Sequence, residues 1–254
     1  MAEQPQPSQP QPTLDPRAEE FFLTGLHFGY SKTRRHPRMK PYLAGLKNNV
    51  EVFNLEKVLV KLKAAETLLE ELGQKNGMAL WVGTKPQAAP FIKAAAAALE
   101  HPSVHRRWLG GTLTNFTAIR KRVQQGMNLK REREEGQLGK YTKQERVKIN
   151  KALERFDHVF SGLELLSRVP EILVIIDPKE ELTALREATQ LGILTVALLN
   201  SDTDPLSVTH PIPGNDNAPA SIRAIIEALC YAYEKGRKNY LQNNDESKPD
   251  KTTS

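Results

Sequence analysis

Ile172-Leu173-Val174-Ile175-Ile176-Asp177-Pro178 consists of five consecutive apolar residues followed by a turn. A short apolar run rich in β-branched residues is typical of a strand that is buried on both faces of a parallel sheet. A helical stripe follows at Leu182, Leu185 and Ala188 and ends at Gly192. A strand followed by a turn and a helix is the unit from which parallel sheets are built.

The same unit recurs along the chain. Met78-Ala79-Leu80-Trp81-Val82 is a second buried run, followed by the turn Gly83-Thr84-Lys85 and by a helical stripe over residues 91–99. Further strands are expected at residues 50–53, near 104 and at 193–199, the last of the series, and further helices at residues 55–72 and from about 220 onwards. Five such units predict a doubly wound α/β domain with a parallel sheet.

Residues 116–165 interrupt this rhythm, because they are far too many for an ordinary connection and have a helical pattern of their own. A coiled-coil spacing of 4, 3, 4 and 3 relates Ile149, Leu153, Phe156, Phe160 and Leu163. The matching stripe on the first half consists of Phe116, Ile119, Val123 and Met127, while Thr142-Lys143-Gln144-Glu145 offers a capping box. We expect a protruding antiparallel two-helix coiled-coil hairpin; the alternative is two ordinary helices packed flat on the sheet.

The hairpin divides the α/β domain into residues 19–115 and 166–242. Residues 1–18 are dominated by Pro and Gln and have few apolar side chains, so they are expected to form a disordered tail. Residues 243–254 are expected to form a second disordered tail.

The charge of the chain indicates a polyanionic partner. The 254 residues carry a formal net charge of +6, with a pI near 9.3. Clustered Lys and Arg bind phosphates by releasing their condensed counterions. No apolar run approaches the ~20 residues of a membrane-spanning helix, and no signal peptide is evident. A single cysteine, Cys230, cannot form an internal disulfide, which favours a reducing cytosol, and a bacterial cytoplasm fits best.

Two basic clusters are candidates for RNA contact. The first contains Lys32, Arg34, Arg35, His36, Arg38, Lys40 and Lys47, with no acidic residue between Glu20 and Glu51. Prolines keep it irregular, as in segments that follow a phosphate backbone, although a merely basic loop is the alternative. The second is the hairpin, where residues 120–155 contain 12 basic against 5 acidic residues, hence +7. Its alternative is a solvated helix pair.

The stretch Arg106-Arg107-Trp108-Leu109-Gly110-Gly111 lies between the first half of the domain and the hairpin. It could bind RNA through its cations, or it could simply pack the start of the hairpin, and Trp108 is expected in the core. The residues expected to contact RNA are Lys32, Arg34, Arg35, Arg38, Lys40, Lys85, Arg106, Arg107, Arg120, Lys121 and Arg122.

An enzyme is the competing interpretation, since Asp177, Asp202, Asp204 and Asp216 follow expected strands, where α/β sheets place active sites and carboxylates could hold magnesium. However, the chain has no phosphate-binding glycine loop, no dinucleotide fingerprint and no nucleophile elbow. His101 and His105 have metal-ligand spacing, but Pro102 interrupts a helix there. We therefore expect no catalysis, no metal and no cofactor.

Several motifs resemble, in order, signatures of the S two family of small-subunit ribosomal proteins. They are Gly25-Leu26-His27-Phe28-Gly29, the basic stretch 34–41, Val82-Gly83-Thr84-Lys85, the stretch 107–115, Ile176-Asp177-Pro178-Lys179, Asp204-Pro205 and Ile212-Pro213-Gly214-Asn215-Asp216. The resemblance covers roughly residues 21–233, and it departs from the family at Asn200-Ser201-Asp202, where Asp-Thr-Asn is commoner.

The resemblance implies a flavodoxin-like domain with a coiled-coil hairpin, of the bacterial and organellar branch. It also implies a structural constituent of the small subunit that binds its rRNA between head and body, beside other ribosomal proteins including S one, and that forms no homo-oligomer. The alternatives are a free-standing RNA-binding regulator on the same fold and, third, a Rossmann-like phosphotransfer or hydrolytic enzyme.

Overall fold

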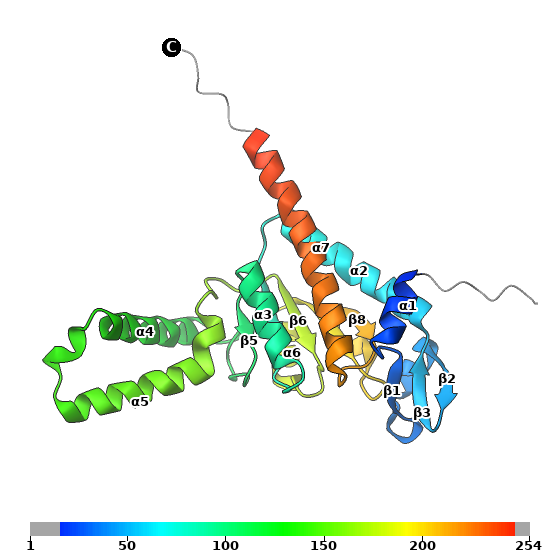
Figure 1. Cartoon of the computed structure of the whole chain (residues 1–254), viewed down its shortest axis with the longest axis horizontal. Coiled ribbons are helices and arrows are strands. Elements are labelled where there is room, and N and C mark those ends of the chain that lie inside the picture. Colours follow the sequence, from blue (N-terminus) through cyan, green and yellow to red (C-terminus); the bar gives the residue numbers. More distant parts are fainter. Residues whose placement is uncertain (1–15, 247–254) are drawn as a thin grey trace, which may run out of the picture.

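The computed structural model of the chain describes residues 16–246, in which a central five-stranded parallel sheet is flanked by helices (Figure 1). The sheet has the order β5-β4-β6-β7-β8, with all neighbours parallel. Its strands are β4 Ala79–Val82, β5 Ser103–Val104, β6 Ile172–Ile176, β7 Leu194–Leu199 and β8 His210–Pro213. Counted within this sheet, the order is 2-1-3-4-5, which is that of a flavodoxin-like doubly wound fold.

Alternation along the central strands divides the interior into two cores. On one face Trp81, Val174 and Leu198 pack against α1, α2, α3 and α7. On the other face Leu80, Leu173 and Ala197 pack against α6 and the base of the hairpin. The helices are α1 Pro16–Leu23, α2 Leu55–Gln74, α3 Ala89–Leu99, α4 Phe116–Glu134, α5 Lys143–Phe160, α6 Leu182–Gln190 and α7 Pro219–Glu246. The apolar runs of β4 and β6 therefore face apolar side chains on both sides.

The last strand of the sheet is β8, so the prediction that residues 193–199 form the final strand is wrong. Two of the four residues of β8 are proline, Pro211 and Pro213, which the sequence pattern does not suggest for a strand. Proline is tolerated here because β8 is an edge strand and pairs only with β7.

Residues 50–53 form a strand, but not in the parallel sheet, which corrects the first expected unit. They are the middle strand, β3 Val50–Phe53, of an antiparallel sheet with β1 Phe28–Ser31 and β2 Leu43–Lys47. Asn48 and Asn49, both with positive φ, turn the chain from β2 to β3. Asn54 caps α2 as expected, its side chain accepting a hydrogen bond from the Lys57 backbone N–H at 3.2 Å.

Short 3-10 helices complete the fold: η1 Lys32–Arg34, η2 Pro37–Tyr42, η3 Gln137–Lys140, η4 Ser161–Leu163 and η5 Pro205–Ser207.

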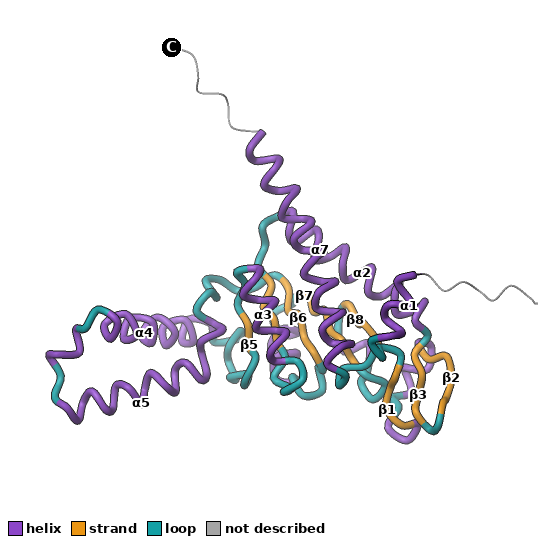
Figure 2. Tube along the Cα trace, in the orientation of Figure 1, coloured by secondary structure: helices purple, strands orange, loops and turns teal. Residues whose placement is uncertain are grey.

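Helices α4 and α5 form an antiparallel hairpin that projects from the body, so the alternative of two helices lying flat on the sheet is wrong (Figure 2). The capping box at Thr142 and Glu145 is confirmed. The seam differs from expectation at one position, because Met127 is 36% exposed and Gly126 packs under the ring of Phe156 in its place. The second core, which packs against α6, includes Ile119, Val123 and Leu163 from this segment. The base of the hairpin is therefore part of the domain core.

The expected tails are shorter than predicted. Residues 16–18 begin α1, with Ala18 fully buried, and residues 243–246 continue α7. The rest of both expected tails, residues 1–15 and 247–254, lies outside the described residues. Between residues 16 and 246, none of the helices has the length and apolar character that crossing a membrane requires.

A buried histidine in the first core gives the fold a pH dependence. His101 accepts a hydrogen bond from Trp81 Nε1 at 3.3 Å, and burial, followed by the charge of Arg237, lowers the pKa of His101 from 6.5 to about 4. In the unfolded chain the imidazole titrates near its ordinary pKa of 6.5. Between this pH and about pH 4, the unfolded state therefore binds a proton that the folded state does not bind. Stability is therefore lost as the pH falls from 6.5 toward 4.

His101→Gln keeps an acceptor for Trp81 but does not titrate. Between pH 6.5 and pH 4.5 we expect the free energy of unfolding of the native chain to fall by about 2 kcal/mol more than that of this variant. Urea unfolding at a series of pH values measures the difference. Parallel pH profiles for the two proteins would show that His101 keeps its ordinary pKa in the fold.

Candidate nucleic-acid interface

The basic segment between β1 and β2 is irregular and largely exposed, as expected. It consists of η1, a linker and the proline-punctuated η2, and it carries exposed Lys32, Arg34, Arg38 and Lys40. The ring of Tyr30 lies under Arg34, with 5.0 Å between the guanidinium carbon and the ring centroid. This contact holds Arg34 at the surface without neutralising its charge.

Acidic residues from elsewhere in the chain pair with two of the arginines. Arg35 Nη1 lies 3.0 Å from Glu51 Oε1, and the Glu51 side chain is only 2% exposed. Arg38 Nη1 lies 2.6 Å from Asp204 Oδ2 at the protein surface. Arg35 therefore has a structural task, since it compensates a buried carboxylate that β3 brings under it.

Arg106 and Arg107 are exposed at the start of the loop that leads from β5 into the hairpin. Arg106 Nη1 contacts His158 Nδ1 on α5. Trp108 is buried, which confirms the prediction that it packs in the core, and its indole N–H donates to Glu187 Oε1 at 3.0 Å. The two arginines thus lie directly before a firmly anchored residue.

The anchor of this loop is the carboxylate of Glu187 on α6, which the sequence reasoning missed. Besides Trp108, it accepts hydrogen bonds from the backbone N–H groups of Gly111, Leu113 and Thr114 at 2.8, 2.9 and 3.1 Å. Burial alone would raise the pKa of Glu187, but these hydrogen bonds outweigh it and hold the pKa below its usual value. A charged group at an inward position of α6, beside the buried Ala184 and Ala188, was the available signal.

The hairpin carries its cations on exposed faces. Lys121 and Arg122 are exposed on α4, and Arg120 is exposed as well while its guanidinium donates to the backbone carbonyls of Leu166 and Ser167. Lys130 on α4 is ion-paired instead, with Asp157 on α5 and with Glu164 beyond it, and Arg131 pairs with Glu135. Most of the positive charge of this element is therefore directed to solvent.

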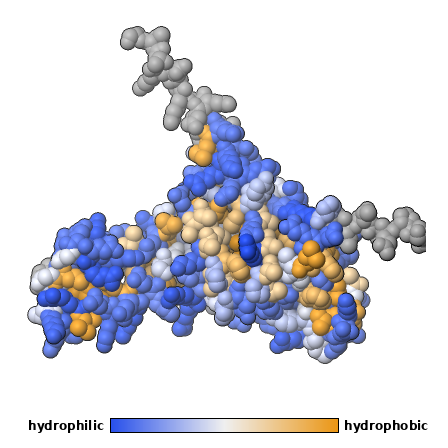
Figure 3. Space-filling model, viewed as in Figure 1, coloured by the Kyte–Doolittle hydropathy of each residue, from blue (hydrophilic) through white to orange (hydrophobic). Residues whose placement is uncertain are grey.

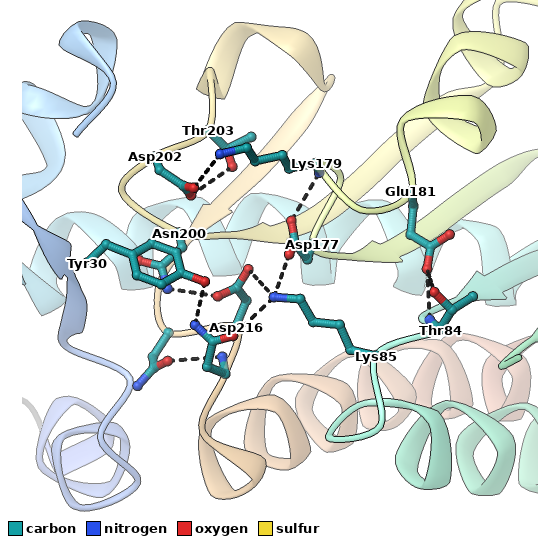
Figure 4. Close-up of polar contacts among 12 residues, drawn as sticks. Tyr30, Thr84, Lys85, Asp177, Lys179, Glu181, Asn200, Asp202, Thr203 and Asp216 are labelled. Carbon is teal, nitrogen blue, oxygen red and sulfur yellow. Dashed lines mark hydrogen bonds and ion pairs between the residues drawn. The ribbon is translucent and has the colours of Figure 1, made fainter. Parts of the chain in front are cut away.

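Lys85 does not belong to this exposed set. It follows β4 and lies at the carboxyl end of the sheet between Asp177, which follows β6, and Asp216, which follows β8 (Figure 4). Its ammonium contacts Asp177 Oδ2, Asp216 Oδ2 at 3.2 Å and Asn217 Oδ1 at 3.1 Å, and the side chain is 13% exposed. All three ammonium protons have acceptors within the protein, so none is left for a phosphate.

The electrostatics of this cluster are those of a compensated buried site. Burial would lower the pKa of Lys85, but Asp177 and Asp216 outweigh it and raise that pKa above its usual value. Burial and the neighbouring Asp177 raise the pKa of Asp216 to about 6, against the opposing effect of Asn200 and Lys85. Doubly wound sheets bind ligands at the carboxyl ends of their strands where the strand order reverses, which here is between β4 and β6, and in this chain Lys85 after β4 is paired with Asp177 after β6.

The other candidates for enzyme chemistry are also tied into the structure. Asp202 pairs with Lys179 at 2.7 Å and Asp204 pairs with Arg38. His101 packs edge-on against Tyr233 with 4.5 Å between ring centroids, and His105 Nδ1 lies 3.3 Å from Ser103 Oγ. Among residues 16–246 there is no group of three or more His, Cys, Asp or Glu side chains that could hold a metal ion.

Comparison with known proteins decides the family. The sequence profile of the family described as Ribosomal protein S2 matches residues 22–236, which include both halves of the domain and the hairpin. The chain belongs to the ribosomal protein S2 family. The expected bacterial type agrees with the organisms of its relatives.

Three similar relatives in that family carry the name small ribosomal subunit protein uS2. The one from Dictyoglomus turgidum is 38% identical over 219 residues, which are 86% of this chain and 89% of the relative. The one from Baumannia cicadellinicola is 35% identical over 224 residues, 88% and 97% of the two chains. The one from Roseiflexus castenholzii is 37% identical over 214 residues, 84% and 81% of the two chains. The similarity to these members of the S2 family therefore extends over more than four fifths of both proteins in each case.

Proposed function

We propose that this chain is a structural constituent of the small ribosomal subunit and supports translation there without catalysing a reaction. The match to the ribosomal protein S2 family over residues 22–236 carries the proposal. The ion-paired carboxylates at the carboxyl end of the sheet agree with it, because Asp177, Asp204 and Asp216 serve as partners of cations within the chain. The bacterial relatives favour a bacterial ribosome in the cytoplasm.

The proposed surface for small-subunit rRNA consists of exposed cations spread along the long axis of the molecule. The segment 32–40 lies at the end formed by β1, β2 and β3, while the hairpin forms the opposite end (Figure 1). Exposed Lys and Arg at both ends suit contact with phosphates of separate RNA elements, such as those of head and body. The proposed contact residues are Lys32, Arg34, Arg38, Lys40, Arg106, Arg107, Arg120, Lys121 and Arg122. Arg35 borders this surface but is paired with Glu51, and Lys85 is not included because it is buried between Asp177 and Asp216.

Protein neighbours, among them ribosomal protein S one, are proposed to contact an apolar surface at the end formed by the small sheet. Phe22, Leu23 and Phe28 are exposed there, and the ring of His27 stacks on Phe22 with 4.2 Å between centroids. The space-filling view shows apolar side chains gathered at this end (Figure 3). Exposed apolar patches with polar rims mark protein interfaces. We propose association with the ribosome rather than with a second copy of the chain.

The RNA contacts are tested by a variant that removes charge without removing internal ion pairs. Lys32, Arg34 and Lys40 are all exposed, and no acidic side chain pairs with them among the described residues. Changing all three to Gln should weaken binding to small subunits that lack this protein. If each contacts one phosphate, the slope of log affinity against log salt should fall by about 2 to 3, because each contact contributes roughly 0.7 to 0.9.

The matched control changes the exposed Lys75, Lys93 and Lys238 to Gln, which alters the net charge equally at sites outside the proposed surface. Circular dichroism checks that both variants fold. Equal slopes for the native chain and the Lys32, Arg34 and Lys40 variant would move the RNA footprint to Arg106, Arg107 and the hairpin. Equal affinity for small subunits and for unrelated RNA would favour a free-standing RNA-binding protein.

A further inference from the structure

The buried Lys85 cluster and the exposed basic segment are joined by an unbroken chain of polar contacts. Asn217, whose side-chain oxygen contacts the Lys85 ammonium, uses its side-chain N–H to donate to the Tyr30 hydroxyl at 2.7 Å. The Tyr30 ring lies under Arg34. One branch therefore leads from Lys85 to the Tyr30 hydroxyl in two hydrogen bonds (Figure 4), and from the Tyr30 ring to the surface cation Arg34.

A second branch reaches the same segment through its backbone. Asp216, the partner of Lys85, accepts a hydrogen bond from Asn200 at 2.7 Å, and the Asn200 side-chain oxygen accepts one from the Ser201 N–H at 2.7 Å. Ser201 then accepts two hydrogen bonds, one from β1 and one from the basic segment: the Tyr30 N–H donates to its hydroxyl at 2.9 Å and the His36 N–H donates to its carbonyl at 2.8 Å. Both ends of the stretch 30–36 are thus fixed to the loop after β7.

The sequence around these contacts is adapted to close approach. A Cβ atom at Gly29 would lie 3.1 Å from Ser201 Oγ and 3.2 Å from the Glu51 carbonyl oxygen, so a side chain there would push β1 away from the loop. Asn200, Ser201 and Asp216 are each no more than 1% exposed. Networks of this kind hold their members in one geometry only when every polar group has a partner.

Lys85 is the group on which both branches depend. Without its ammonium, Asp177 and Asp216 would face each other as uncompensated buried carboxylates, and Asn217 would lose the cation that orients its side chain. We propose that Lys85 is a positioning residue, which acts from the interior through Asn217 and Ser201 to hold Tyr30 and Arg34 in place for contact with a phosphate. The inference rests on the proposed function, because it requires that Arg34 contacts rRNA.

Two measurements on the full chain test it, and the first does not involve RNA. In Lys85→Met, the backbone amides of Tyr30 and His36 should exchange with deuterium about tenfold faster, while the Trp81 amide in β4 keeps its protection. Asn217→Ala leaves both ion pairs of Lys85 intact and removes only the bond to the Tyr30 hydroxyl. Because both amides donate to Ser201, this variant should leave their exchange unchanged, which would assign the effect of Lys85→Met to the branch through Ser201. Unchanged exchange of both amides in Lys85→Met would overturn the proposal.

The second measurement asks whether Lys85 acts through Arg34. Arg34→Gln should lower the salt slope of small-subunit binding by about 0.7 to 0.9 in the native background and by much less in the Lys85→Met background. Arg107→Gln, outside the network, should lower it equally in both backgrounds. An equal decrease for Arg34→Gln with and without Lys85 would show that Lys85 does not position Arg34, and the inference would be wrong.

The two measurements also separate this inference from the proposed function. If the amides exchange faster but Arg34→Gln leaves the native slope unchanged, the RNA contact proposed for Arg34 fails while the positioning of the segment by Lys85 is confirmed.

Discussion

Replacing Glu187 by Ala is expected to lower the free energy of unfolding by about 3 to 4 kcal/mol. The carboxylate accepts hydrogen bonds from Trp108 Nε1 and from three backbone N–H groups of the loop between β5 and α4. Removing it leaves these donors without their acceptor, and each donor that stays buried without a partner costs about 1 to 3 kcal/mol. Water can reach the more exposed of these donors, so the expected loss of stability is smaller than the sum of the four separate costs.

Urea unfolding measures this loss, and the neighbouring Arg186 supplies the control. Arg186 is exposed on the same turn of α6, so Arg186→Ala should change stability by no more than about half a kcal/mol. Glu187→Gln keeps the side-chain volume but turns an NH₂ group toward the donors. Its loss in the free energy of unfolding should therefore lie between those of Arg186→Ala and Glu187→Ala. A decrease of less than 1 kcal/mol for Glu187→Ala would mean that the loop is held by Trp108 packing alone.

Replacing Gly236 by Ala should destabilise the protein by about 2 kcal/mol, although Ala is the better helix former. Helices α2 and α7 cross in close contact at Gly73 and Gly236. A Cβ at Gly236 would overlap the backbone carbonyl of Glu70 and lie 2.9 Å from the Gln74 backbone nitrogen. Backbone atoms cannot rotate away, so the helices must separate, which costs about 3 kcal/mol and outweighs the ~1 kcal/mol gained in helix propensity.

The control for this prediction is Gly45→Ala on β2, since a Cβ there meets no atom within 4 Å and the residue does not need positive φ. It should leave the urea midpoint unchanged or raise it slightly. If Gly236→Ala is as stable as Gly45→Ala, the crossing of α2 and α7 is looser than the structure has it.

Much of the fold could be predicted because burial leaves a periodic trace in sequence. The strands β4 and β6 are apolar at every position since both faces are covered, and the hairpin seam follows the spacing of Leu153 and Phe156. β8 left no such trace, because its edge position admits two prolines. Gly126 replaced Met127 in the seam because helix packing at close range selects the residue that leaves room for Phe156.

The site was harder to predict than the fold, because sequence does not show which charges are compensated. Arg35 belongs to the same basic cluster as Arg34, and Lys85 lies in a turn after a strand, yet the topology brings Glu51 to Arg35 and brings Asp177 and Asp216 to Lys85. Each of these carboxylates is far from its partner in the chain. The motifs at 82–85 and 212–216 did identify the residues that meet at the sheet end, but not that they satisfy one another.

The central claim, that the chain is a constituent of the small ribosomal subunit, is tested most directly by sucrose-gradient sedimentation. Small subunits lacking this protein are mixed with a slight excess of the full chain at moderate salt, and the small-subunit fractions are assayed for it. We expect one copy per subunit, retained through the gradient, and none on large subunits. Recovery of the chain at the top of the gradient, or equal retention on both subunits, would contradict the proposed function.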